Sequence, residues 1–173
     1  VTYNSYVAPS VLQVDGAMDV AVEFNSLSKT WNMPGWRVGM AVGNPQALTA
    51  LAQVKSNMDS GMFCPLQEAA ARALAIDPAW IATRNATYRQ RMEILLAGLE
   101  GTGMQGQLPR AALYIWASVP PGETSEPFAL TLLNQTGVAV APGSFFGPAG
   151  EGYVRLSVTA PTDHIHEAVT RLQ

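Results

Sequence analysis

Residues 25–39, NSLSKTWNMPGWRVG, hold the side chains of this sequence that are best suited to covalent chemistry. Lys29 follows two serines, and Arg37 stands eight residues after it. A lysine amine has a reference pKa of about 10.4, and it forms imines with aldehydes when burial or a neighbouring cation lowers that pKa. Arg37 is a candidate for the cation, and the nearby apolar residues are candidates for the burial: Phe24, Leu27, Trp31 and Trp36. The stretch therefore predicts a nucleophilic lysine.

The hydroxyl groups of Ser26 and Ser28 and the guanidinium of Arg37 form a candidate anion site beside this lysine. Arginine suits phosphate because its planar fork donates two parallel hydrogen bonds. We therefore interpret Lys29 as the covalent anchor of a cofactor aldehyde whose phosphate binds to the three neighbours. The competing interpretation is a solvated lysine at the end of a strand, and it would prevail if the lysine stood alone.

Two short segments flank this stretch and would position it. Residues 20–26, VAVEFNS, alternate apolar and polar side chains and predict a strand. Residues 36–42, WRVGMAV, predict a second strand. We expect both to be central in a sheet rich in parallel pairs, and without upstream neighbours their free edges would favour self-association. Lys29 would then lie on a connection at a strand end, where side chains of α/β folds commonly meet ligands.

The remaining sequence alternates predicted helices with predicted strands. Apolar residues recur at helical spacing after residue 44, Pro65 suits the first turn of an alanine-rich helix, and Asp77-Pro78 suits the start of a long one. The helices are expected at 45–58, 65–76, 78–99, 125–135 and 162–172, and the strands at 112–119, 138–141 and 153–159. This order predicts an α/β or α+β chain.

Composition and charge narrow the classes of function. The chain has 173 residues, of which 48% are hydrophobic, enough for one ordinary core or a modest pair of lobes. With a net charge of −3 and scattered cations, it is not expected to bind nucleic acid. The nearest cationic cluster, Arg84, Arg89 and Arg91, is expected on a solvated helix face. No apolar stretch reaches the ~18 residues of a membrane span, so we expect no membrane partner.

The cysteine and the histidines point away from a metal site. Cys64 is the single cysteine, which rules out an internal disulfide and leaves no pair for zinc. Between Phe63 and Pro65 it is expected to be a small buried apolar residue. His164 and His166 are two positions apart in a predicted helix and would not share a face. Because no signal peptide is recognisable, a reducing cytoplasm is the expected location.

The segment SLSKTWNMPGWRVG resembles the cofactor-lysine signature of the class I/II aminotransferases, which are fold-type I enzymes that use pyridoxal 5′-phosphate. That signature has Ser-x-Ser-Lys, an arginine eight residues after the lysine, and then a small strand with glycine. The resemblance implies that Lys29 is the catalytic lysine that binds the cofactor covalently. It also implies that Ser26, Ser28 and Arg37 bind the phosphate.

A second segment, GVAVAPGSFFGPAGEGYVRLSV at 137–158, resembles the late part of the same family, in which an arginine binds the α-carboxylate of the substrate. That role falls on Arg155. The alternative for this residue is a surface strand arginine paired to an acid such as Glu151. NMDSGMFCPLQEAAARAL, at 57–74, resembles the passage between the family's two domains, and the phrasing is closest to the branch of LL-diaminopimelate, alanine and aspartate aminotransferases.

The resemblance implies an α/β fold in which this chain is the C-terminal part of a transferase that depends on pyridoxal phosphate. Residues 1–45 would be the tail of the large domain, and residues 46–173 a small α+β domain. Independently of the resemblance, the late alternation of short strands and helices predicts that helices cover one face of a small, mainly antiparallel sheet in this domain. The substrates would be an amino acid and a 2-oxo acid, and the full-length enzyme would be a homodimer.

The family's other cofactor residues, including an Asp that pairs with the pyridine nitrogen, would lie upstream of Val1, so the chain alone is expected to be inactive. Two alternatives remain open on the residues. One is a domain of a transcriptional regulator that senses pyridoxal phosphate, and the other is a non-catalytic fragment.

Overall fold

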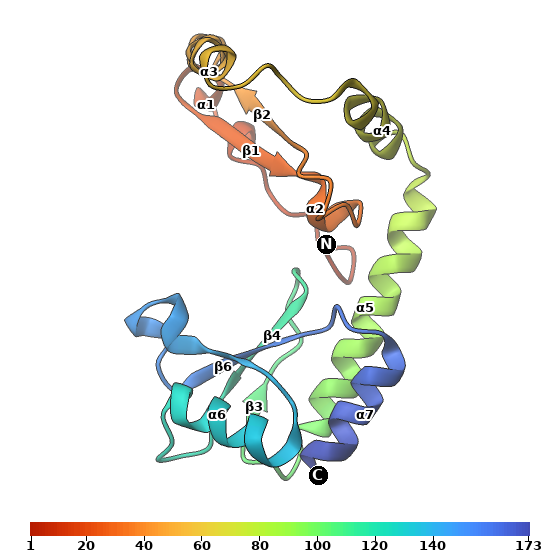
Figure 1. Cartoon of the computed structure of the whole chain (residues 1–173), viewed down its shortest axis with the longest axis vertical. Helices are drawn as coiled ribbons and strands as arrows, with labels where there is room; N and C mark the ends of the chain where they lie inside the picture. Colours follow the sequence, from red (N-terminus) through yellow and green to blue (C-terminus); the bar gives the residue numbers. More distant parts are fainter. The chain divides into compact units, whose positions relative to one another are not determined.

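The computed structural model describes all residues from Val1 to Gln173, and they form two compact units. We call Val7–Ala82 the lysine unit, because it includes Lys29, and Val1–Tyr6 with Thr83–Gln173 the arginine unit, because it includes Arg155. Figure 1 shows the elements of both units, coloured along the chain. The expected domain boundary between residues 45 and 46 falls inside the lysine unit and stays a prediction.

A two-stranded sheet and four helices make up most of the lysine unit. In chain order its elements are η1 (Val11–Gln13), α1 (Ala17–Val20), β1 (Val22–Ser26), α2 (Leu27–Thr30), β2 (Gly39–Gly43), α3 (Pro45–Met58) and α4 (Cys64–Leu74). The two strands run antiparallel, with Val22 opposite Gly43 and Ser26 opposite Gly39.

The two strands pair antiparallel with each other, and their central place in a sheet rich in parallel pairs stays a prediction for the full-length protein. The chain turns back after α2, and the Leu27 amide donates to the Val38 carbonyl at 3.1 Å, which continues the antiparallel ladder. β2 begins at Gly39, later than expected, because Arg37 has a φ of 54° in the left-handed region and interrupts an extended strand. Lys29 lies on the short helix α2, which directly follows β1 in the connection to β2, so its predicted place at a strand end is confirmed.

The core of the lysine unit is small. Its buried residues are Leu27, Met33, Val38 and Ala70. Helix α3 has the predicted bounds, and the side chain of Asn44 caps it by accepting from the Ala47 amide at 2.8 Å. None of its residues is buried. The apolar face that predicted this helix is therefore largely exposed: Leu48 is half-buried, but Leu51, Ala52 and Val54 are exposed.

Cys64 corrects one prediction, because its side chain is exposed and not buried. It is the first residue of α4, whose partly or fully buried positions are Leu66, Ala69, Ala70 and Ala73. At about 100° per residue, Cys64 lies on the opposite side of the helix from Leu66. The neighbouring Phe63 and Pro65 do not bury it.

The arginine unit contains most of α5 (Pro78–Gly98), which begins in the lysine unit. Its other elements are β3 (Gln105–Gly106), β4 (Tyr114–Ser118), α6 (Ser125–Thr136), β5 (Ala141–Pro142), η2 (Gly143–Phe146), η3 (Pro148–Gly150), β6 (Tyr153–Ser157) and α7 (Thr162–Leu172). The strands form one sheet in the order β3-β4-β6-β5, and every neighbouring pair is antiparallel.

One face of this sheet is buried against helices. Ile115 and Ala117 on β4 and Val154 and Leu156 on β6 point into a core shared with α5, α6 and α7. α5 and α7 lie side by side in Figure 1, with α6 near the same sheet. Because side chains alternate along a strand, the residues adjacent to these four on β4 and β6 point to the opposite face of the sheet. The prediction of helices over one face of an antiparallel sheet is confirmed.

Two details of this unit differ from expectation. Only Ala141 of the expected strand at 138–141 joins the ladder, together with Pro142, because pairing with β6 starts where Ala141 lies opposite Arg155. Arg84 is buried, with 8% of its surface exposed, and not solvated, and this burial lowers the pKa of its guanidinium. Arg91 is half-buried and donates to Thr162 Oγ1 at 3.0 Å. Arg89 is half-buried as well and donates to Asn4 and Glu93, so the predicted solvated face does not form.

Candidate active site

Lys29 is held by the helix start that the two serines build. Ser26 caps α2, and its Oγ accepts from the Ser28 amide at 3.2 Å and donates to the Ser28 Oγ at 2.9 Å. Leu27 anchors the helix with 1% of its surface exposed. Two positions along a helix differ by about 200°, so burying Leu27 turns the exposed Lys29 outward. The two hydroxyls thus lie together just before an outward-facing amine.

Arg37 lies at the same end of the sheet as the serines. The ladder ends with Ser26 opposite Gly39 and the Leu27 amide bonded to the Val38 carbonyl, so Ser28 and Lys29 on one strand's continuation and Arg37 on the other's lie just beyond this end. Its guanidinium donates to the Pro34 carbonyl at 2.9 Å and is otherwise exposed. The structure therefore gathers the four residues predicted to bind a cofactor at one end of the β1–β2 ladder.

The backbone of Arg37 is strained. A non-glycine residue in the left-handed region costs about 1–3 kcal/mol and persists only where its surroundings hold it. The turn after Pro34 and the ladder bond at Val38 hold it here.

The predicted apolar surround of Lys29 forms only in part. Leu27 is buried and Trp31 is half-buried, but 71% of Phe24 and 45% of Trp36 are exposed. Phe24 lies on a sheet of only two strands, which does not cover its side chain. Trp36 lies in the exposed turn that starts at Pro34. The prediction that four apolar side chains enclose the lysine is wrong for this chain by itself.

Arg155 stands on the face of the four-stranded sheet that the helices leave open. Its guanidinium carbon lies 4.3 Å from the ring centre of Tyr114 and 4.6 Å from that of Phe146. The alternative pairing with Glu151 does not occur. That carboxylate accepts from the Ser125 amide at 2.7 Å and from the Ser125 hydroxyl at 2.9 Å. These hydrogen bonds, with one from the Gly152 amide, hold the pKa of Glu151 below its usual range.

Other aromatic side chains extend the open face around Arg155. Trp116 stacks on Tyr153 with ring centres 5.6 Å apart and meets Phe146 edge-on at the same distance. With Tyr114 and the segment 105–110, Trp116 and Tyr153 line a hollow of about 640 Å³. The site predicted from the sequence did not include Tyr114 or Phe146. The alternation of residues 114–118 could have placed Tyr114 and Trp116 opposite the buried Ile115, but no local pattern brings Phe146 to the arginine.

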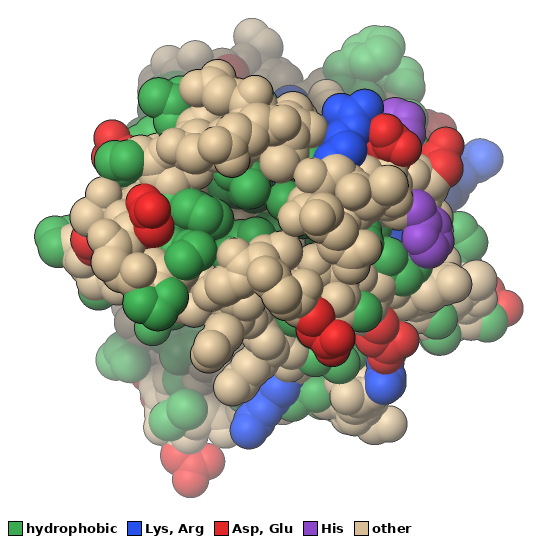
Figure 2. Space-filling view, turned by 90° about the horizontal axis from the view of Figure 1, so that it is seen from below, with side chains coloured by type: hydrophobic (Ala, Val, Ile, Leu, Met, Phe, Trp, Pro, Cys, Tyr) green, Lys and Arg blue, Asp and Glu red, His purple; other side chains and the backbone are tan.

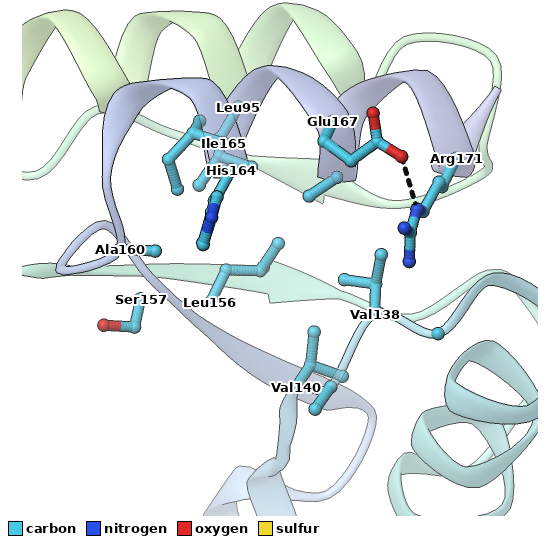
Figure 3. Close-up of a pocket in the computed structure, with 13 residues that line it drawn as sticks. Leu95, Val138, Val140, Leu156, Ser157, Ala160, His164, Ile165, Glu167 and Arg171 are labelled. Carbon is cyan, nitrogen blue, oxygen red and sulfur yellow. Dashed lines mark hydrogen bonds and ion pairs between the residues drawn. The ribbon is translucent and has the colours of Figure 1, made fainter.

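A second hollow of about 470 Å³ lies in the same unit between α7, the segment 137–140 and β6 (Figure 3). Its walls include Val138, Val140 and Leu156, and the ion pair of Glu167 and Arg171, 2.8 Å between Oε1 and Nε, stands at one end. Figure 3 shows His164 pointing from α7 towards the strand that carries Leu156. This hollow contains none of the predicted site residues.

Both histidines of the chain belong to α7, and Figure 2 shows them beside acidic and basic side chains at one edge of the visible face. Across the chain, no three His, Cys, Asp or Glu side chains group as a metal site would require. None of the helices is both long enough and apolar enough to cross a membrane.

Comparison with known proteins decides the family. Residues 2–172 match the sequence profile described as aminotransferase class I and II. The chain belongs to this family. It is 46% identical over 171 residues to LL-diaminopimelate aminotransferase 2 of a Nostoc species, covering 99% of this chain and 44% of that protein. It is 48% identical to LL-diaminopimelate aminotransferase of Oleidesulfovibrio alaskensis, covering 98% of this chain and 44% of that protein.

Solved structures of aminotransferases share the fold. A probable N-succinyldiaminopimelate aminotransferase from Thermus thermophilus superposes with a TM-score of 0.90 at 34% identity, covering 99% of this chain and 46% of that one. An aromatic aminotransferase from Pyrococcus horikoshii gives a TM-score of 0.91 at 30% identity, with the same coverage. The predicted fold class and family branch are confirmed. The chain spans a little under half the length of these aminotransferases.

Proposed function

We propose that the protein to which this chain belongs transfers an amino group between an amino acid and a 2-oxo acid with pyridoxal 5′-phosphate. The observation that carries the proposal is the joined hydroxyl pair of Ser26 and Ser28 directly before Lys29, with Arg37 at the same end of the ladder. Membership of the aminotransferase family supports it. The regulator has no comparable support, since the relatives named above are aminotransferases. The proposal concerns the full-length protein, and the chain by itself is still expected to be inactive.

The donor set fits this cofactor. Two hydroxyls and a guanidinium are suitable partners for a phosphate, and Lys29 offers the primary amine that an aldehyde requires. When bound, pyridoxal phosphate supplies that aldehyde and a ring that stabilises negative charge on the substrate Cα. Ser26, Ser28 and Arg37 would hold the phosphate in place.

The roles of the two cations follow from their chemistry. Lys29 Nζ would bind the cofactor covalently and, once displaced by substrate, move a proton at the substrate Cα. Arg155 would bind the α-carboxylate of the substrate through its planar fork and so orient the Cα. Both roles are proposals for the full-length protein.

Variants of the two lysines test the cofactor site in the full-length protein. Lys29→Ala should abolish the long-wavelength absorbance of the bound cofactor, because only a primary amine forms the linkage. Lys55→Ala is the matched control. Its ammonium pairs with Asp59 at 2.5 Å on α3, and the absorbance should stay. The proposal fails if the two variants behave alike.

Variants of the two arginines separate the cofactor from the substrate. Arg37→Ala should weaken cofactor retention about ten- to hundredfold, because a charge-assisted hydrogen bond is worth about 1.5–3 kcal/mol. Arg155→Ala should leave retention unchanged and raise KM for the amino acid. Equilibrium dialysis measures cofactor retention, and steady-state kinetics measure KM. If Arg155→Ala loses the cofactor and Arg37→Ala only raises KM, the two proposed roles are wrong.

The names of the relatives suggest the first substrate to test. Because several proteins 46–48% identical to the chain are LL-diaminopimelate aminotransferases, LL-diaminopimelate is the amino acid that we propose. We also propose a cytoplasmic homodimer whose small domain starts near residue 46. Sedimentation of the full-length protein tests the dimer, and limited proteolysis near residue 46 tests the boundary.

A further inference from the structure

Aromatic rings contact the guanidinium of Arg155, and no carboxylate pairs with it. The ring of Tyr114 comes from β4, the neighbouring strand, and the ring of Phe146 comes from η2, after β5. The guanidinium carbon lies 4.3 Å and 4.6 Å from their centres, and it forms no ion pair in the described chain. Because this half-buried arginine contacts two rings and pairs with no carboxylate, its N–H groups can still bind an anion.

The geometry explains why rings, and not an acid, surround this cation. An aromatic face attracts a cation through the ring quadrupole without accepting its N–H bonds as a carboxylate would. The five N–H donors of the guanidinium lie in its plane, so contacts made over the rings leave them available for a carboxylate. Glu151, four residues before Arg155 in the sequence, is already held by Ser125 at the start of α6.

We propose that Tyr114 and Phe146 act as an aromatic clamp that holds the Arg155 guanidinium ready to bind the α-carboxylate of the substrate. They are positioning residues, because they act through Arg155. The inference rests on the proposed function of Arg155. An arginine whose side chain is already ordered loses less freedom on binding, so the clamp increases the affinity for the carboxylate.

The surroundings of Phe146 show that the clamp is itself held in place. Trp116 packs edge-on against Phe146 and stacks on Tyr153. Gly143 and Gly150 cross so closely that a Cβ on Gly143 would lie 1.9 Å from the Gly150 carbonyl oxygen, which ties the two ends of the loop together. The adjacent Phe145 is 71% exposed and has no ring partner in the structure. The loop therefore presents only the second of its two phenylalanines to the arginine.

The test compares the two phenylalanines in the full-length, cofactor-loaded protein, with 2-oxoglutarate as the titrated carboxylate. Phe146→Leu should weaken 2-oxoglutarate binding about three- to thirtyfold, the range that corresponds to one cation–π contact. Phe145→Leu, the matched control, should bind as the unchanged protein does. Phe146→Tyr and Tyr114→Phe keep a ring and should restore or retain binding, whereas Tyr114→Leu should weaken it. Isothermal calorimetry gives the dissociation constants.

Kinetics distinguish a positioning role from a general loss of structure. Phe146→Leu should raise KM for the amino acid by the same factor and change kcat little, because Phe146 is not at the reacting atoms. Since 51% of Phe146 is exposed, the leucine variant is expected to fold, and Tyr114→Leu tests the clamp from the other side.

The outcomes separate the clamp from the role of Arg155. If 2-oxoglutarate does not bind the unchanged protein, or if Arg155→Lys retains full binding, the proposed role of Arg155 is wrong and the clamp fails with it. If Arg155→Lys loses binding while Phe146→Leu, Tyr114→Leu and Phe145→Leu all match the unchanged protein, the clamp alone is overturned.

Discussion

The two units of this chain differ in how completely they bury their own side chains. The arginine unit has fifteen buried residues in one hydrophobic cluster, and the lysine unit has four. In the lysine unit, Phe24, Val54 and Met58 are more than half exposed. The predicted carboxylate-binding residue therefore stands on a sheet with its own core, whereas the predicted cofactor lysine stands on a short helix held by capping hydrogen bonds and one buried leucine.

The two predicted site residues are therefore held in position in two different ways. Arg155 is positioned by tertiary contacts from two strands and a loop. Lys29 is positioned by local geometry, through the Ser26 cap and the hydrogen bond between Leu27 and Val38. Local geometry follows from a short sequence pattern, and tertiary contacts do not.

The largest expected effect is a difference in core mutations between the units. Ile115→Ala should destabilise the arginine unit by about 2–5 kcal/mol, because Ile115 is fully buried. Val54→Ala on the exposed face of α3 should change stability by no more than about 0.5 kcal/mol. Urea unfolding of the 173-residue chain measures both effects. Trp116 fluorescence follows the arginine unit and Trp31 fluorescence follows the lysine unit, each with the other tryptophans replaced by Phe. Similar losses of stability in the two variants would contradict the difference in burial between the two units.

Gly143 tests whether the loop that carries Phe146 is as constrained as the core. Gly143→Ala should cost about 1–3 kcal/mol, because its Cβ would overlap backbone atoms that cannot move aside as a side chain could. Gly147→Ala is a control for backbone conformation without overlap, since no atom lies within 4 Å of its Cβ position although its φ is 106°. Thermal unfolding should rank Gly143→Ala as the more damaging change.

Tyr3 tests how the first residues attach to the arginine unit. Its hydroxyl donates to the Ala112 carbonyl at 2.6 Å, and burial raises its pKa to about 12 from the ordinary value of 10. The stability from this shift is fully present below pH 10 and is lost as the pH rises through about 12. Tyr3→Phe should cost about 1 kcal/mol at neutral pH and remove this alkaline loss. Tyr6→Phe is the control, and alkaline unfolding curves compare the two.

Glu151 should give the smallest effect, limited to acid pH. Its carboxylate accepts three hydrogen bonds that lower its pKa below the ordinary value of 4.5. The stability that they add is present above about pH 4.5 and is lost as the pH falls through the lowered pKa. Glu151→Gln should flatten the dependence of unfolding on pH in this range. Glu123→Gln is the control. If Glu151→Gln leaves the slope of stability against pH unchanged, the hydrogen bonds from Ser125 do not depend on the negative charge of Glu151.

The parts of the structure that the sequence predicted are local. The start of α3 at Asn44-Pro45, the spacing of Lys29 and Arg37, and the alternation along β4 and β6 each depend on residues near in the chain. Helix spans and the antiparallel sheet of the arginine unit followed from such patterns.

The errors concern contacts between distant residues. Arg84 is buried in the same region where the Asn85 side chain donates to the Thr2 carbonyl at 3.0 Å, 83 positions earlier. Phe146 reaches Arg155 only because a loop crosses itself at two glycines. Cys64 is exposed because of the rotation of α4 and not because of its neighbours in sequence. The helical period could have placed Cys64 opposite Leu66, but neither a helical period nor a charge count contains the contacts of Arg84 and Phe146.

Reduction of the cofactor linkage is the most direct test of the central claim that Lys29 anchors the cofactor. The full-length protein, loaded with pyridoxal phosphate, is treated with borohydride, digested and mapped by mass spectrometry. We expect a reduced pyridoxyl adduct on the peptide that carries Lys29 and none on the peptide that carries Lys55, the only other lysine in the chain. An adduct on Lys55, or no adduct on either peptide while the cofactor is bound, would contradict it.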